Sequence, residues 1–134
     1  MSTVLANTIT AVGGGGSTLK MANDATYVSD GGAVTQNTVQ GLAKCWVNFD
    51  GTGTAALDDS FNASGLTDNG TGDFTVAINN DMSNANYSCQ FNGNSAHVGL
   101  TAIATGSLQV FVTAANDSSQ DVDPVTYLAH GDLA

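Results

Sequence analysis

Hydrophobic and polar residues alternate most clearly in residues 42–49. Successive side chains of a β-strand point to opposite faces of its sheet, so this period of two predicts a strand. One face would carry Ala43, Cys45, Val47 and Phe49, and the other would carry Leu42, Lys44, Trp46 and Asn48. The glycines of residues 50–53 suit a tight turn after this strand, because glycine adopts a positive φ without steric cost.

The same signals recur along the rest of the chain and predict about seven strands. Residues 68–73 contain an Asn-Gly pair, which is a strong hairpin signal, and lead into apolar residues at period two. The predicted strands cover residues 42–49, 57–62, 74–78, 87–91, 96–104, 108–113 and 125–130. Strands at this spacing, without helices between them, predict an all-β domain over residues 42–134, folded as a jelly roll or β-sandwich of about seven to eight strands.

Residues 1–41 lack this pattern and are predicted to form an extended N-terminal arm. The segment is rich in Gly, Ser and Thr, holds four consecutive glycines and contains one aromatic residue, Tyr27. The segment has too few large side chains to build a core of its own. If it is ordered, we therefore expect it to lie against a neighbouring subunit. Its apolar residues are therefore candidate interface residues: Val4, Leu5, Ile9 and Val12. The alternative is a free N-terminal tail.

The charge balance excludes two classes of partner. The chain has no Arg and no Glu, and its two Lys stand against twelve Asp, for a formal net charge of −10. Nucleic acids and anionic membranes are bound through clustered Lys and Arg, so neither is an expected partner. No segment approaches the roughly 20 apolar residues of a membrane span, and residues 1–10 lack the charged start and apolar block of a signal peptide.

Two cysteines are too few for a disulfide framework. Cys45 and Cys89 both lie in alternating segments, where cysteine often serves as a small buried hydrophobic residue. We therefore expect two buried free thiols, and a disulfide between them is the alternative.

No motif points to catalysis or to a cofactor. The four glycines precede Lys20, but the hydroxyl residue that follows the lysine of a phosphate-binding loop is missing, so the run is interpreted as a flexible hinge. Ser95 lies near His97 without the flanking glycines and the strand-to-helix turn of a nucleophile elbow. The protein is therefore not expected to be an enzyme.

Metal binding is also weakly indicated. Asp117, Asp121 and Asp123 offer oxygen ligands for Ca²⁺, but their spacing is not that of an EF-hand loop, and we interpret them as a solvated acidic loop. His97 and His130 have no cysteine partners at metal-ligand spacing. No metal site is predicted.

Trp46 and Tyr87 are candidate interface residues. Aromatic side chains on an exposed β face can stack on sugar rings, which would indicate a receptor-binding surface. The interpretation we favour is that both residues anchor the core or a subunit interface, where aromatics bury a large area per residue.

Five runs of sequence carry a resemblance to a known family. They are GLAKCWVNFDGTGT at 41–54, SFN at 60–62, TDNGTGDFTV at 67–76, ANY at 85–87 and VTYLAHGD at 125–132. In order and spacing they resemble a module of tailed-bacteriophage virion proteins that is familiar near the C-terminal ends of tail fibres. The resemblance covers about residues 41–132 and implies a structural protein of the virion.

A tail fibre usually carries a long shaft before this module, whereas here about forty residues precede it, since the resemblance begins at Gly41. The expected function is therefore that of a trimeric capsid cement or decoration protein, which stabilises the phage head by bridging copies of the major capsid protein. It would be made in the cytoplasm of the host bacterium and lie on the capsid exterior. The alternative is the receptor-binding tip of a tail or head fibre that recognises host surface glycan.

Overall fold

The computed structural model describes residues 25–28 and 35–134. Four residues of the predicted arm, Val4, Leu5, Ile9 and Val12, lie outside these residues. The elements are, in order, β1 (Thr26–Val28), β2 (Thr35–Asn37), α1 (Thr38–Gly41), β3 (Ala43–Asp50), β4 (Ala56–Phe61), β5 (Ala63–Gly70), β6 (Asp73–Ile78), β7 (Ser88–Gly93), β8 (His97–Ala104), β9 (Ser107–Thr113) and β10 (Val125–His130).

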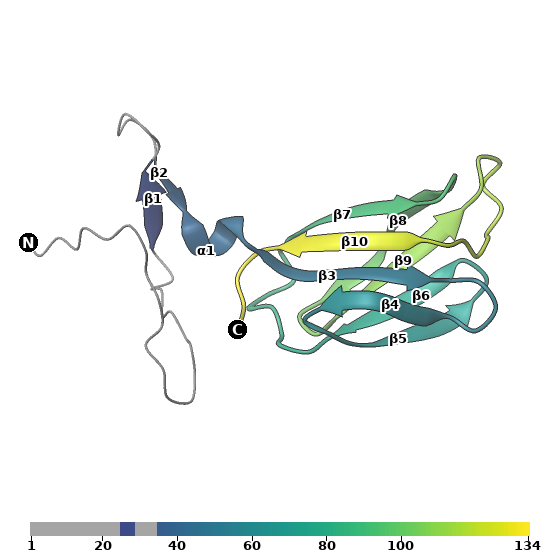
Figure 1. Cartoon of the computed structure of the whole chain (residues 1–134), viewed down its shortest axis with the longest axis horizontal. Helices are drawn as coiled ribbons and strands as arrows, with labels where there is room; N and C mark the ends of the chain where they lie inside the picture. Colours follow the sequence, from purple (N-terminus) through teal and green to yellow (C-terminus); the bar gives the residue numbers. More distant parts are fainter. Residues whose placement is uncertain (1–24, 29–34) are drawn as a thin grey trace, which may run out of the picture.

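Eight of these strands form two four-stranded antiparallel sheets that pack face to face (Figure 1). One sheet has the order β4-β3-β10-β7 and is called here the β3–β10 sheet. The other has the order β5-β6-β9-β8 and is called the β6–β9 sheet. The predicted all-β fold is confirmed, and it takes the form of a β-sandwich.

The core lies between the central strands of the two sheets, as the alternation of their sequences requires. The β3–β10 sheet contributes Cys45, Val47, Phe49, Val125, Tyr127 and Ala129, and the β6–β9 sheet contributes Phe74, Val76, Ile78, Leu108, Val110 and Val112. The rings of Phe49 and Phe74 meet edge to face across the interface, with centroids 5.2 Å apart. Burial of this apolar set stabilises the sandwich, at about 25 cal/mol for each Å² removed from water.

The structure corrects the sequence prediction around residues 63–73. β5 was not among the predicted strands, because it is mostly polar, contains two glycines and forms an edge of its sheet. The predicted hairpin exists, but Gly70 pairs with Asp73, so its two-residue loop is Thr71-Gly72 rather than the Asn-Gly pair. Gly72 has a φ of +70°, a conformation that glycine adopts without strain.

A small hairpin and one helical turn precede the sandwich. β1 pairs with β2, and the side chain of Asn37 caps α1 by accepting a hydrogen bond from the Gln40 N–H at 2.8 Å. In Figure 1 these elements and the C-terminus lie at one end of the sandwich, which we call the arm end. The opposite end, which we call the far end, holds the loops after β3, β5 and β9.

Candidate functional site

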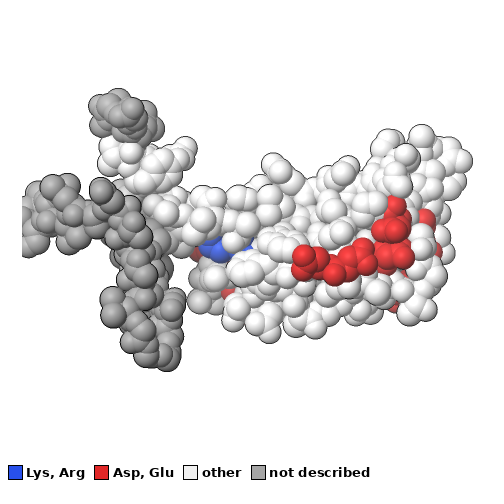
Figure 2. Space-filling model, viewed as in Figure 1, with Lys and Arg blue, Asp and Glu red and all other residues white. Residues whose placement is uncertain are grey.

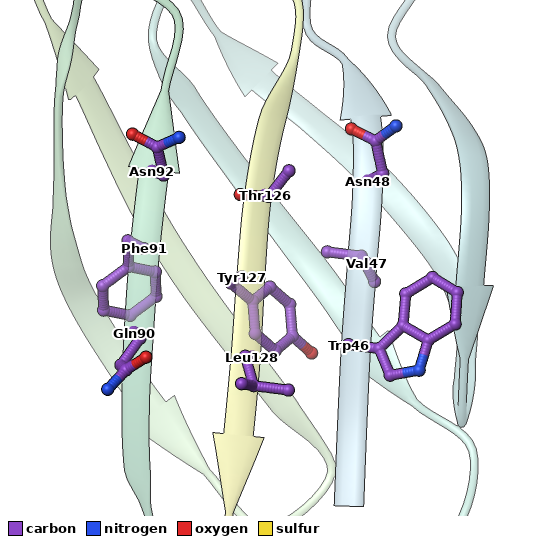
Figure 3. A pocket seen from close by; sticks show the side chains of 9 residues that line it. All are labelled: Trp46, Val47, Asn48, Gln90, Phe91, Asn92, Thr126, Tyr127 and Leu128. Carbon is purple, nitrogen blue, oxygen red and sulfur yellow. The ribbon is translucent and has the colours of Figure 1, made fainter. Parts of the chain in front are cut away.

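A shallow groove of about 370 Å³ crosses the outer face of the β3–β10 sheet (Figure 3). Its lining comes from three adjacent strands, β3, β10 and β7, which lie far apart in sequence. The lining residues are Trp46, Val47, Asn48, Gln90, Phe91, Asn92, Thr126, Tyr127 and Leu128. Strand alternation divides them into outward side chains, which form the walls, and the inward Val47, Phe91 and Tyr127.

The register of the strands arranges the outward side chains in two rows. Leu128 lies opposite both Trp46 and Gln90, which makes the first row. Thr126 lies opposite both Asn48 and Asn92, which makes the second row, called here the amide row. Figure 3 shows the two rows side by side across the three strands.

Edge strand β4 extends both rows beyond the groove. Phe61 lies opposite Trp46, and Asp59 lies opposite Asn48. The first row therefore ends in a second aromatic ring, and the amide row ends in a carboxylate. The groove itself is lined by uncharged residues only.

The side-chain oxygen of Asn48 is buried and has no hydrogen-bond partner within the part of the chain that the structure describes. A buried carbonyl oxygen normally accepts a hydrogen bond, because its separation from water is otherwise uncompensated. Asn48 lines the groove, and a turn of its side chain toward the groove would bring this oxygen within reach of a bound donor.

The thiols beneath this sheet are not poised to react. Cys45 is fully buried, and its Sγ lies 2.9 Å from the hydroxyl of Tyr127. Burial raises the pKa of the Cys45 thiol, and burial together with nearby Cys45 raises the pKa of Cys89 to about 11. Both thiols are therefore protonated at neutral pH. The expectation of free thiols is confirmed, although Cys89 is only partly buried.

A second candidate surface lies at the arm end. Leu42, Phe61 and Leu133 are exposed to 56%, 53% and 42%, and all three line one groove of about 270 Å³. We call this groove the arm-end surface; its other lining residues are Val39, Ala43, Lys44, Asn62 and Asn80. On the neighbouring hairpin, Tyr27 and Val28 are also more than half exposed.

Lys44 holds the helical turn α1 against this end of the sandwich. Its ammonium group donates hydrogen bonds to the carbonyl oxygens of Val39 and of Leu42, the latter at 2.7 Å. The side chain is 5% exposed, and this desolvation lowers the pKa of Lys44, partly opposed by the carboxylate of Asp132. Strand alternation alone placed Lys44 on the outer face, and the covering by α1 explains why it is nonetheless buried.

Carboxylates gather on β4 and toward the far end (Figure 2). Asp58 and Asp59 lie on β4, Asp50 ends β3, and Asp123 precedes β10. The pKa of Asp123 is raised by desolvation and by the charges of Asp50 and Asp58. The negative charge of these side chains opposes the approach of another acidic surface at this end.

The predicted interface residues Trp46 and Tyr87 are not brought together. Tyr87 is buried inside the sandwich, where its hydroxyl donates to the carbonyl oxygens of Ala104 at 2.9 Å and Ser107 at 3.3 Å. Tyr87 therefore anchors the core. Trp46 is half-buried on the outer face and lines the groove there.

The acidic loop near the far end has structural contacts of its own. Asp121 accepts a hydrogen bond from the Gly72 N–H at 2.8 Å, which ties this loop to the turn between β5 and β6. Within residues 25–28 and 35–134, no three His, Cys or Asp side chains gather in a way that would hold a metal ion.

Comparison of the chain with protein-family models, curated proteins and solved structures finds no match. Among the described residues, no helix has the length and apolar character needed to cross a membrane. The fold and the two candidate surfaces therefore carry the functional argument.

Proposed function

We propose that the protein is a structural protein of a bacteriophage virion, a homotrimeric decoration protein that cements the capsid exterior by bridging copies of the major capsid protein. The observation that carries this proposal is the arm-end surface, where three large apolar side chains are exposed beside one another. Contiguous exposed apolar patches mark sites of protein association. The resemblance of residues 41–132 to virion modules supports the same assignment.

The two ends of the domain suit a protein that attaches in one direction. The arm-end surface offers apolar area, and each Å² buried there contributes about 25 cal/mol before the costs of association. The acidic side chains of β4 and the far end favour solvent and repel further copies. We propose that the arm end faces the capsid and neighbouring subunits, and that the far end points away from them.

The proposed mechanism requires no catalytic group. A protein that binds across the joints between capsid subunits, and binds only when those joints are closed, adds its binding free energy to the closed shell. The head then withstands higher temperature and internal pressure. The loss of the decoration protein lowers this resistance without changing the capsid fold.

The alternative function is that of a receptor-binding tip on a tail or head fibre. One observation favours it, namely the groove beside Trp46, whose amide and aromatic lining suits a glycan. Binding of purified protein to intact host cells, but not to capsids, would select this alternative.

The proposal is tested by adding purified protein to phage heads that lack it. We expect the protein to sediment with the heads and to raise the temperature at which they release DNA. Phe61→Ser should weaken sedimentation by about tenfold or more, because it removes apolar area from the arm-end surface.

Phe111→Ser is the matched control, because Phe111 is an exposed aromatic residue on the outer face of the β6–β9 sheet and pairs with Asp73 at the far end, away from the arm-end surface. It should sediment with heads as the unmodified protein does. Failure of the unmodified protein to bind, or equal weakening by both variants, would contradict the proposed attachment.

A further inference from the structure

We propose that the groove on the outer face of the β3–β10 sheet binds a neutral saccharide, with a sugar ring lying along Trp46 and Leu128 and with hydroxyl groups bonded to the amide row. This goes beyond the architectural function and does not depend on it; it deepens the alternative function by naming the ligand class and the residues that would bind it. The groove and the arm-end surface share no lining residue.

The lining matches the chemistry of a sugar ring. One face of a pyranose is made of C–H groups, which pack on an aromatic ring, and its rim carries hydroxyls that both donate and accept hydrogen bonds. Trp46 and Leu128 form the apolar row, and Asn48, Asn92 and Thr126 form the adjacent polar row. Each side-chain amide offers one acceptor and two donors, so it can bind two neighbouring hydroxyls at once.

The unpartnered oxygen of Asn48 indicates what the ligand must supply. That oxygen belongs to a residue of the groove lining, is itself buried, and lacks a donor among the described residues. A turn of the Asn48 side chain toward the groove would let a ligand hydroxyl donate to it, whereas a purely apolar ligand would leave it without a donor. The ligand is therefore expected to carry hydroxyl donors.

Charge restricts the class of saccharide. None of the nine lining residues is charged, and Asp59 continues the amide row immediately beyond Asn48. A uronic acid or sulfated sugar would place an anion near this carboxylate with no cation opposite it. Neutral sugars avoid that repulsion.

The fold disfavours an extended peptide in the same place. The groove lies on the face of the sheet, over β3, β10 and β7. Of these three strands only β7 has a free backbone edge, and a strand added there would extend the sheet in its own plane rather than fill the groove. Its volume of about 370 Å³ lies near the lower end of small-molecule sites, which are about 300–1,000 Å³. This size suits one or two sugar residues of a longer glycan.

The chain provides its own reporter, because Trp46 is its only tryptophan. The experiment titrates the full-length protein with maltohexaose, cellohexaose, chitohexaose and hexagalacturonate, and follows indole fluorescence and the single indole N–H resonance. We expect a saturable change with at least one neutral probe at about millimolar concentration, and none with hexagalacturonate.

Three variants assign the change to the groove, with the bound fraction followed by the same signals. Asn48→Ala and Asn92→Ala should each weaken binding by up to about tenfold, because each removes hydrogen bonds to the ligand. Thr101→Ala, an exposed polar position on β8 of the other sheet, should leave it unchanged. Asn92 is exposed on edge strand β7, so its variant is expected to fold even if Asn48→Ala does not.

Several results would overturn the inference. They are the absence of a saturable change with every neutral probe, binding of hexagalacturonate alone, and binding that Asn92→Ala leaves intact. Sedimentation with phage heads is a separate measurement, so failure of saccharide binding would leave the architectural proposal standing, and the reverse also holds.

Discussion

The arm end and the far end of the sandwich are built from the same two sheets but expose different kinds of side chain. At the arm end, Leu42, Phe61 and Leu133 are exposed, and a buried lysine fixes one helical turn over the strands. At the far end, carboxylates face solvent. Under the proposed function, the arm end is the part that another molecule covers, whereas the far end is complete without one.

The far end is held by close backbone packing. A side chain at Gly72 would place its Cβ 2.4 Å from the carbonyl oxygen of Val112 and 3.0 Å from the backbone N of Gln120. At Gly51, the Cβ would lie 2.8 Å from the ring of Phe74 and 3.1 Å from the carbonyl oxygen of Val122. These glycines let the loops lie directly on the sandwich, so the far end is expected to tolerate little change.

The largest expected effect is that of Gly72→Ala. The substitution forces a Cβ against backbone atoms at a φ of +70°, and we expect a loss of about 3 kcal/mol or more in the free energy of unfolding. Gly53→Ala is the matched control, because Gly53 has a φ of +61° but open space around it, so only the conformational cost of about 1 kcal/mol applies. Urea unfolding of both variants measures the difference. Equal losses would show that the far end is not closely packed.

The next effect concerns the arm end and follows from Lys44→Met. This variant removes the donor to the carbonyl oxygens of Val39 and Leu42, and we expect it to lower the free energy of unfolding by about 1–2 kcal/mol. Hydrogen exchange should also accelerate at the Gln40 N–H, because α1 loses its attachment to the sandwich. An unchanged exchange rate would mean that α1 is held by other contacts.

The pH dependence of the same pair of proteins sharpens this test. The folded-state pKa of Lys44 lies below its ordinary value of 10.5, so between these two values the unfolded chain binds more protons than the folded one. Stability contributed by Lys44 therefore rises with pH across this window. The difference in free energy of unfolding between the unmodified protein and Lys44→Met should therefore also increase with pH. Urea unfolding at several pH values measures this difference.

The smallest expected effect belongs to Cys89, between the two ends. The pKa of Cys89 is raised from 9.0 to about 11. The stability that its protonated thiol contributes is therefore complete below pH 9 and is lost as the pH rises toward 11. Cys89→Ser should flatten the fall of stability in this range, whereas Ser88→Ala, at the exposed neighbouring position, should not. Thermal unfolding midpoints at pH 8 to 11 would report it, and an unaltered slope in Cys89→Ser would contradict the raised pKa of this partly buried thiol.

Strand alternation predicted the parts of the fold that the core controls. β3, β6, β9 and β10 alternate between apolar and polar residues, and their apolar faces are the ones that pack together. β5 was not predicted, because an edge strand with polar residues and glycines has no such alternation. Alternation also assigns the two candidate aromatic residues to opposite faces. At a period of two, Tyr87 points inward like Phe91, whereas Trp46 points outward like Asn48.

The groove was not predictable from the sequence because it depends on strand order. Trp46, Gln90 and Leu128 become neighbours only when β10 pairs with both β3 and β7. Local patterns do not specify that pairing. The burial of Lys44 has the same origin, because it requires α1 to fold back over the start of β3.

The most direct test of the central claim, that the arm end is an association surface, is sedimentation equilibrium of the full-length chain compared with Phe61→Ser. The account predicts a particle with the mass of three chains for the unmodified protein and a shift toward the monomer for Phe61→Ser, while Phe111→Ser keeps the larger mass. A monomer at every concentration, or a trimer that Phe61→Ser leaves unchanged, would contradict it.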